Sequence, residues 1–387
     1  DNRIDGCGGW GDAATIVPWE MYEAYGDIRI LKKCYDMMKK WVEYQNSTDR
    51  RNYGVRTVDG KEVPEQSDLA TIPYIQVQQC RGDHLTYDNS TPYIYSATAY
   101  AAHSADILRR TAYILGKTDD EKRYTELFEN IKRAFNDAWV NDDGSVSYYG
   151  EVSSQTAHCG ESVALDGSVT RYTYYAENTP HCPSQTAYAL AVDFDLIPKD
   201  KLKNTRKYFK NSILRNNGKL TVGFLGISHL APALSKVDLD DVAFKLLEQE
   251  DNPSWLYSVK NGATTIWERW NSYIAETDTF GDVSMNSFNH YSYGAIGQWF
   301  FTDILGICPV EFGYKSFMLA PKFGGGLTYA KGSFTSPYGK ISSAWKLHDG
   351  KFTYDCTVPT NTTATLKLPN GDIHTLVGVS YHFEIDV

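Results

Sequence analysis

The segment TPYIYSATAYAAHSADILRRTAYILGKTDDEKRYTELFENIKRAFNDAW, residues 91–139, decides the fold class because it contains two helices joined by a very short connection. Thr91-Pro92 is typical of a helix start, since Thr caps the first turn and Pro fits its first position. Gly116 suits the end of this helix. The next helix has one apolar face at three-four spacing, formed by Tyr124, Leu127, Phe128, Ile131, Phe135 and Trp139. The pair is therefore predicted to form an antiparallel helical hairpin.

Working outward, helical spacing extends from about residue 13 to residue 305. Residues 30–46 have an expected apolar face of Ile30, Cys34, Met37, Met38, Trp41 and Tyr44. Further helices are expected near residues 184–196, 199–213, 224–235, 239–249 and 289–305. Three long intervals, 47–90, 140–183 and 250–288, are predicted to be functional or to carry short strands.

After Ile307-Cys308-Pro309 the pattern changes to that of strands. Residues 339–345, 351–358 and 362–368 alternate apolar with polar side chains or are rich in β-branched ones, and Asp-Gly and Asn-Gly pairs separate them. We therefore predict a mainly α fold with two domains. Residues 1–306 are helical, and residues 307–387 form a small antiparallel β-sandwich.

The composition narrows the class of partner. The 387 residues have a net charge of −10, with acidic and basic residues mixed, which disfavours nucleic acid. No apolar stretch is long enough to cross a membrane. Aromatic residues make up 14%, including 28 Tyr and 9 Trp, which is equally consistent with a tyrosine-rich core and with a carbohydrate site. The seven scattered Cys residues include no Cys-x-x-Cys pair, which argues against bound zinc and weakly favours a reducing compartment over the periplasm.

Glu268 is the strongest candidate for catalysis. It lies in Gly262-Ala263-Thr264-Thr265-Ile266-Trp267-Glu268-Arg269-Trp270, between two tryptophans. A carboxylate withdrawn from water is a stronger base, which suits general-base catalysis. The alternative is a glutamate paired with Arg269 in a packed loop.

Three further residues are candidates for ligand contacts, each with a structural alternative. Asp12 follows Gly9-Trp10-Gly11, where glycines allow close approach of a ligand, but it could simply cap the next helix. Asp83, in Arg81-Gly82-Asp83-His84, is on its residues alone more typical of a loop aspartate that binds its own backbone. His290 could hold a sugar hydroxyl or be a structural histidine.

Taken together, these segments resemble glycoside hydrolase family 78, the α-L-rhamnosidases. The matching stretches keep their order along nearly the whole chain: Gly9–Ala13, Pro18-Trp19, Tyr25–Asp27, Thr98–Ser104, Gly223–Gly226, Pro253–Trp255, Gly262–Trp270 and Asn286–His290. The resemblance implies an (α/α)6 toroid with a C-terminal β-sandwich. It also implies hydrolysis of terminal α-L-rhamnose from oligosaccharides, polysaccharides or glycosides with inversion, without metal or cofactor.

The resemblance also implies roles for individual residues. Glu268 corresponds to the general base that activates water. Asp12, Trp10 and His290 correspond to residues around the sugar, and Asp83 to a further site residue. Trp267 and Trp255 are expected to wall the pocket. Where the family often has Gly-Asp-Trp, this chain has Gly82-Asp83-His84, which indicates a different preference for the leaving group.

The family's general acid precedes the Gly-Trp-Gly-Asp loop, which stands here at residues 9–12. The acid is therefore expected to lie ahead of residue 1, and about nine expected helices fall short of six complete hairpins. On this basis the chain is predicted to be a fragment that is inactive alone. The alternatives are another inverting toroid glycosidase, acting on a glucoside or glucuronide, and an inactive sugar-binding fragment.

Overall fold

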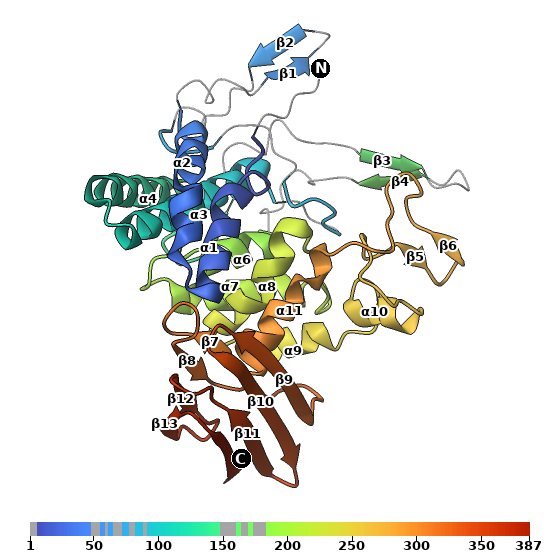
Figure 1. The fold of residues 1–387 in the computed structure, drawn as a ribbon. Helices are drawn as coiled ribbons and strands as arrows, with labels where there is room; N and C mark the ends of the chain where they lie inside the picture. The colour runs from blue at the N-terminus through green and yellow to red at the C-terminus, as the bar shows by residue number, and fades with distance from the viewer. Residues whose placement is uncertain are drawn as a thin grey trace. The chain divides into compact units, whose positions relative to one another are not determined.

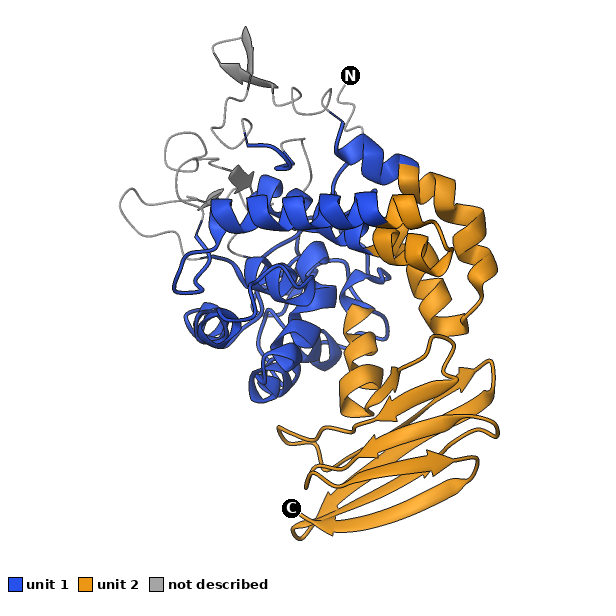
Figure 2. Cartoon of the chain, turned by 90° about the vertical axis from the view of Figure 1, so that its left-hand side faces the viewer, with its two compact units in different colours: residues 1–12, 40–106, 122–294 blue, residues 13–39, 107–121, 295–387 orange. Residues whose placement is uncertain are grey.

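The computed structural model describes residues 6–47, 55–58, 61–64, 72–76, 82–87, 91–147, 160–163, 169–172 and 183–387. Packing divides the chain into two units (Figure 2). Unit 1 comprises Asp1–Asp12, Lys40–Asp106 and Lys122–Gly294, and unit 2 comprises Ala13–Lys39, Ile107–Glu121 and Ala295–Val387. Because this division does not follow chain order, the boundary expected after residue 306 stays a prediction.

The first part of the chain is mostly helical, as expected, and sheets follow at the C-terminus (Figure 1). The helices are α1 (Ala13–Tyr25), α2 (Ile28–Gln45), α3 (Tyr93–Ile114), α4 (Thr118–Trp139), α6 (Gln185–Asp193), α7 (Leu202–Leu214), α8 (Phe224–Lys236), α9 (Asp240–Leu247), α10 (Trp255–Lys260) and α11 (Ile296–Trp299). A 3-10 turn, Ser292–Ala295, precedes α11, and a π-helical turn, Phe300–Ile304, follows it. No described helix has the length and apolarity needed to cross a membrane.

The expected hairpin of α3 and α4 is present. Gly116 has a φ of +69°, the left-handed conformation that ends a helix, and the amide of Lys117 donates to the carbonyl of Ala112. In unit 1, Tyr95 of α3 packs on Phe135 and Trp139 of α4, with ring centroids 4.7 and 5.1 Å apart. The predicted apolar face of α4 is therefore the packed one.

The buried face of α2 is shifted by about one position along the sequence from the predicted face. Leu31, Tyr35, Met38 and Val42 are buried, whereas Met37 and Tyr44 are exposed. Both rows have helical spacing, so the pattern alone could not choose between them.

Helix α6 is buried on all sides and forms the centre of unit 1, against α7 and α8. Ser184 caps it by accepting a hydrogen bond from the amide of Ala187, as expected of a Ser in that position. Gly226 of α8 lies against Thr186 of α6, where an added Cβ would be 2.2 Å from the Thr186 hydroxyl oxygen. This close approach brings the start of α8 next to the loop that contains Asp83.

The three long intervals carry short antiparallel hairpins, as the sequence suggested. They are β1 (Val55–Val58) with β2 (Lys61–Pro64), β3 (Gly160–Val163) with β4 (Val169–Tyr172), and β5 (Tyr273–Ile274) with β6 (Thr279–Phe280). Helix α10 was not predicted, because its six residues are too few for a helical period to stand out.

Eight strands form two four-stranded sheets in unit 2, in the orders β14-β11-β10-β9 and β13-β12-β8-β7 (Figure 1). The strands are β7 (Ile307–Pro309), β8 (Ser316–Leu319), β9 (Tyr329–Ser336), β10 (Gly339–His348), β11 (Lys351–Thr357), β12 (Thr363–Lys367), β13 (Ile373–Val377) and β14 (Ser380–Asp386). All neighbouring strands pair in an antiparallel manner except β8 and β12, which are parallel. The sequence predicted antiparallel sheets and did not indicate this parallel pair.

The turn between β10 and β11 shows why the strand prediction succeeded. Asp349 and Gly350 have φ values of 50° and 74°, the mirror-image turn that matches the twist of a hairpin. In the same sheet Trp345, Phe352 and Tyr354 are buried, and the Trp345 indole nitrogen donates to the carbonyl of Ile304 at 2.8 Å. The β-sheets thus have an aromatic core of their own.

Two thiols in unit 2, the half-buried Cys308 and the buried Cys356, predict that the folded protein loses stability at alkaline pH. Burial raises the pKa of Cys308 to about 11 and that of Cys356 to about 12, from an ordinary value of 9.0. The folded protein therefore keeps protons that the unfolded chain releases above pH 9, so the stability associated with these thiols is complete below pH 9 and falls as the pH rises towards 11. Melting temperatures of the wild type and Cys308→Ser between pH 8 and 11 test this.

Because serine does not ionise in this range, the melting temperature of Cys308→Ser is expected to fall less steeply with pH. Cys34→Ser, at a half-buried position on α2, is the matched control and should keep the wild-type slope. Equal slopes for all three proteins would contradict the prediction. Cys80, Cys159 and Cys182 lie outside the described residues.

Candidate active site

The loop that contains Asp12 is held in place by hydrogen bonds to the buried Asp12 carboxylate. The Asp12 side chain is fully buried, and its carboxylate accepts hydrogen bonds from the amide of Gly9 and from the side chains of Trp41, Gln45 and Ser104, at 2.5–3.0 Å. Burial raises the pKa of Asp12, and these four hydrogen bonds oppose that shift. The carboxylate thus faces its own loop and two helices.

The same packing leaves Trp10 at the surface of the loop. An added Cβ on Gly11 would lie 2.2 Å from the Trp41 ring, so only glycine fits there. Trp10 itself is 37% exposed. Asp12 thus ties this loop to two helices, whereas Trp10 is exposed at its surface.

Asp83 holds a second loop against the start of α8. Its carboxylate accepts from the amides of Gly223, Leu225 and Gly226 at 2.8–3.0 Å and from the hydroxyl of Thr186. Burial raises the pKa of Asp83, with these four bonds acting against the shift. Because the N-cap residue, Gly223, has no side chain, Asp83 does the work of the cap from a distant part of the chain.

The two pinned loops bring together an aromatic cluster, which we define as Trp10, His84, Phe224, His290 and Tyr293. Phe224, the first residue of α8, lies at its centre, with ring centroids 5.2–6.2 Å from the other four. The cluster joins four segments that are far apart in sequence. Asp83 contributes by placing His84 and Phe224, and it has no exposed face of its own.

Glu268 lies on a segment that pairs with residues 287–290. Its amide donates to the carbonyl of Ser287 at 2.8 Å, and the amide of His290 donates to the carbonyl of Ile266 at 2.8 Å. The Ser287 amide in turn donates to Glu268 Oε2 at 2.7 Å. This ladder fixes both the backbone and one oxygen of Glu268.

The other oxygen of Glu268 is available. Oε1 accepts no hydrogen bond from the described part of the chain, and it is not among the fully buried oxygens that lack a partner, so it keeps contact with solvent. The side chain as a whole is only 9% exposed. Arg269 does not neutralise it, because the Arg269 guanidinium faces Asp282 and the carbonyl of Met285.

Tyr293, a member of the aromatic cluster, is within electrostatic reach of both Asp83 and Glu268. Burial first, and then the negative charge of Asp83, hold the pKa of the Tyr293 hydroxyl well above its usual value, and Glu268 adds to this effect. Tyr293 also stacks on Trp270, with centroids 3.9 Å apart, and donates to the carbonyl of Leu85 at 3.1 Å. Asp83, Glu268 and the cluster therefore belong to one region of unit 1.

Trp255 and Trp267 line a pocket of about 270 Å³, which we call the indole pocket. Its wall also includes Trp270, Tyr293, Ser258 and Arg269, but not Glu268. The Trp255 indole donates to the carbonyl of Tyr293 at 2.9 Å, and Trp267 packs edge-on against Phe288. The two tryptophans that were expected to wall the sugar pocket thus line a cavity whose lining does not include Glu268.

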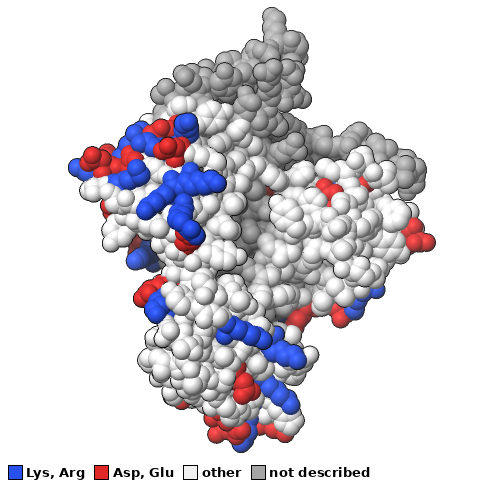
Figure 3. Space-filling model, viewed as in Figure 1, with Lys and Arg blue, Asp and Glu red and all other residues white. Residues whose placement is uncertain are grey.

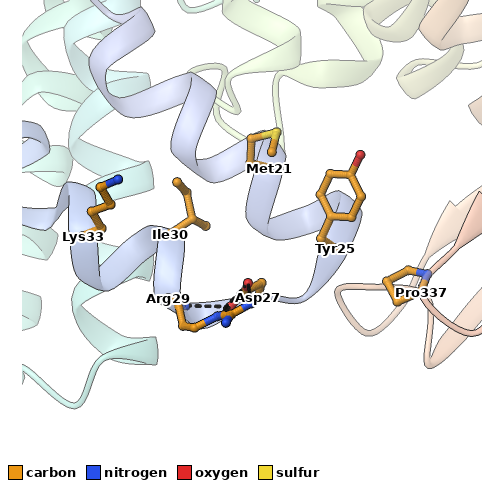
Figure 4. A pocket seen from close by; sticks show the side chains of 7 residues that line it. All are labelled: Met21, Tyr25, Asp27, Arg29, Ile30, Lys33 and Pro337. Carbon is orange, nitrogen blue, oxygen red and sulfur yellow. Dashed lines mark hydrogen bonds and ion pairs between the residues drawn. The ribbon is translucent and has the colours of Figure 1, made fainter.

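A larger, open pocket of about 660 Å³ lies in unit 2, where α1 turns into α2 (Figure 4). Its lining combines Met21 and Tyr25 of α1, Lys33 of α2 and Pro337 from the turn between β9 and β10. At its edge Asp27 forms a bidentate pair with Arg29, which lowers the pKa of Asp27 to about 2. Its polar groups are thus already paired with each other at that edge.

The described residues contain no group of three or more His, Cys, Asp and Glu side chains arranged to hold a metal ion. On the face shown in Figure 3, Lys and Arg side chains lie among Asp and Glu side chains. Phe224 and Tyr293 were missed as site residues. The motif Gly223-Phe224-Leu225-Gly226 gave a signal for Phe224, since tight glycines flank it, but Tyr293 had none.

Comparison with known proteins first gives the class. Residues 2–304 match the model of the bacterial alpha-L-rhamnosidase 6 hairpin glycosidase domain. Residues 306–383 match the bacterial alpha-L-rhamnosidase C-terminal domain. The chain therefore belongs to the bacterial α-L-rhamnosidase family.

Individual relatives agree with this assignment. Curated α-L-rhamnosidases of Formosa agariphila and Streptomyces avermitilis are 34% and 35% identical, each over 95% of this chain. The crystal structure of the Streptomyces avermitilis enzyme complexed with L-rhamnose matches 98% of this chain with a TM-score of 0.80 and 31% identity. This chain spans about a third of the length of these relatives, at 34%, 30% and 33% respectively.

Proposed function

We propose that this chain carries the general base of a glycoside hydrolase that releases terminal α-L-rhamnose with inversion. The observation that supports it best is the state of Glu268, with one carboxylate oxygen held by a backbone amide and the other open. The names of the relatives supply the sugar, since they are α-L-rhamnosidases and one was solved with L-rhamnose.

In the proposed mechanism, the Ser287 amide fixes Glu268 so that Oε1 accepts a proton from water as that water attacks the anomeric carbon. Inversion requires a second carboxyl group roughly 6.5–9.5 Å away, which protonates the leaving oxygen on the opposite face of the sugar. The general acid is not assigned to a described residue. Two carboxyl groups suffice for this chemistry, so the proposal needs no cofactor.

The remaining predicted residues take roles that fit their positions. Trp10 and His290, from the aromatic cluster, are proposed to contact the sugar. Asp12 and Asp83 are proposed to act indirectly, by holding the two loops. Trp267 and Trp255 are proposed to act as walls of the indole pocket.

We also propose the finer architecture that the resemblance implied. The helical hairpins close into an (α/α)6 toroid, and the two C-terminal sheets form a β-sandwich that begins after residue 306. The match of residues 2–304 to a six-hairpin domain supports the toroid. Contact between His374 of β13 and Phe383 of β14, with centroids 4.9 Å apart, supports packing of one sheet on the other.

The proposed function is tested with nitrophenyl glycosides, supplied to this chain and to the full product of its gene. We expect hydrolysis of the α-L-rhamnoside at least 100-fold faster than that of the matched glucoside and glucuronide, in one or both proteins. Proton NMR during the first turnovers should show β-L-rhamnose, the inverted product. Faster cleavage of a glucoside or glucuronide, or release of the α anomer, would contradict the proposal.

A further inference from the structure

The lining of the indole pocket combines aromatic residues with polar side chains that have few or no hydrogen-bond partners among the described residues. Arg269 makes two long contacts through one nitrogen, Nη1, at 3.5 Å to Asp282 and 3.4 Å to the carbonyl of Met285. Its Nε and Nη2 bond to none of the described residues, and neither do the hydroxyls of Ser258 and Thr264. Three residues of the cavity lining, Arg269, Ser258 and Thr264, thus carry polar groups that bond to none of the described residues.

The state of Arg269 contrasts with that of Arg29, which shows what a satisfied guanidinium looks like in this chain. Arg29 donates to both oxygens of Asp27 at 2.6–2.9 Å although it is almost fully exposed. Arg269, at 21% exposure, is far more buried and yet less well paired. The Nε and Nη2 atoms of Arg269 are not among the fully buried atoms that lack a partner, so they keep contact with solvent and are open to an anionic partner.

Asp282 does not fill this need. Its Oδ1 already accepts from the amide and hydroxyl of Ser284 at 2.9 and 2.6 Å, and only Oδ2 faces Arg269, at 3.5 Å. The free edge of the guanidinium is therefore available to a carboxylate that enters the pocket, with the geometry for a bidentate pair.

We propose that the indole pocket is a second sugar-binding site, which takes a six-membered ring bearing a carboxylate, that is, a uronic acid. The carboxylate pairs with Arg269, the ring lies against the wall formed by Trp255 and its neighbours, and Ser258 and Thr264 bind ring hydroxyls. A volume of about 270 Å³ suits a single ring. Because Glu268 is not part of the lining, this site is separate from the proposed base.

The test is isothermal titration of this chain with methyl β-D-glucuronide, methyl β-D-glucoside and benzoate. We expect the glucuronide to bind at least 10-fold more tightly than the glucoside, because only it pairs with Arg269. Arg269→Gln should remove this preference, whereas Glu268→Gln should keep it. Equal binding of glucuronide and glucoside, or binding of neither, would overturn the proposal, and tighter binding of benzoate would overturn the assignment to a sugar.

A second variant covers the case in which Arg269→Gln does not fold. Ser258→Trp places a ring in the pocket from α10 and should weaken glucuronide binding at least 10-fold. Lys260→Trp, on the same helix but outside the lining, is the matched control and should bind as the wild type does. Unchanged binding by Ser258→Trp would place the ligand elsewhere. Since no hydrolysis is measured, these results do not depend on the proposed rhamnosidase activity.

Discussion

Replacing Glu268 with Gln is expected to lower kcat for α-L-rhamnoside hydrolysis by about 10²–10⁴-fold, the range over which a positioned general base contributes. The amide keeps the shape of the side chain and can still accept from the Ser287 amide, but it cannot take a proton from water. The measurement is the initial rate on nitrophenyl α-L-rhamnoside, with the full product of the gene.

Binding should survive this change, because glutamine leaves the aromatic cluster in place. We therefore expect the inhibition constant for free L-rhamnose to change less than threefold, while kcat collapses. Glu276→Gln, on the same excursion of the chain at an exposed position, is the matched control and should keep its rate. A Glu268→Gln enzyme that turns over at the wild-type rate would remove this residue from the base role.

Replacing Asp83 with Ala is expected to cost about 3–5 kcal/mol of unfolding free energy, which makes it the most destabilising single change considered. The substitution leaves three backbone amides at the start of α8 and the Thr186 hydroxyl without their common acceptor. Asp83→Asn should lie between Ala and the wild type, because its amide group can satisfy some of these donors but turns an N–H towards others.

Chemical denaturation followed by circular dichroism measures this cost. Asp241→Ala, an exposed carboxylate in the first turn of α9, is the control and should lose well under 1 kcal/mol. A loss below about 1 kcal/mol for Asp83→Ala would show that the four hydrogen bonds are replaced by water or by rearrangement of the loop. The order Ala, Asn, wild type is as informative as the size of the loss.

Local signals in the sequence predicted what local interactions determine. The hairpin of α3 and α4 and the turn at Asp349-Gly350 depend on residues a few positions apart, and each is present. The buried face of α2 is not determined by such local signals. Two adjacent rows of apolar residues have the same helical spacing, and only tertiary packing selects the row with Leu31 over the row with Ile30.

The candidate site divides in the same way. Glu268 stood out because tryptophans flank it in the sequence, whereas Tyr293 joins the candidate site only through contacts with distant segments. The role of Asp83 in capping α8 could not be predicted from the sequence either, because its hydrogen bond with the Leu225 amide joins residues 142 positions apart. A sequence read alone shows a carboxylate in a loop and gives no sign of the helix end that it satisfies.

Hydrogen bonds between residues 266–268 and 287–290 join the two ends of the long loop that contains β5 and β6. A loop tied at its neck can change length and chemistry at its tip while the glutamate at its base stays in register. Residues 275–278, at the turn of that hairpin, are therefore a suitable place to insert new sequence without moving the backbone of Glu268.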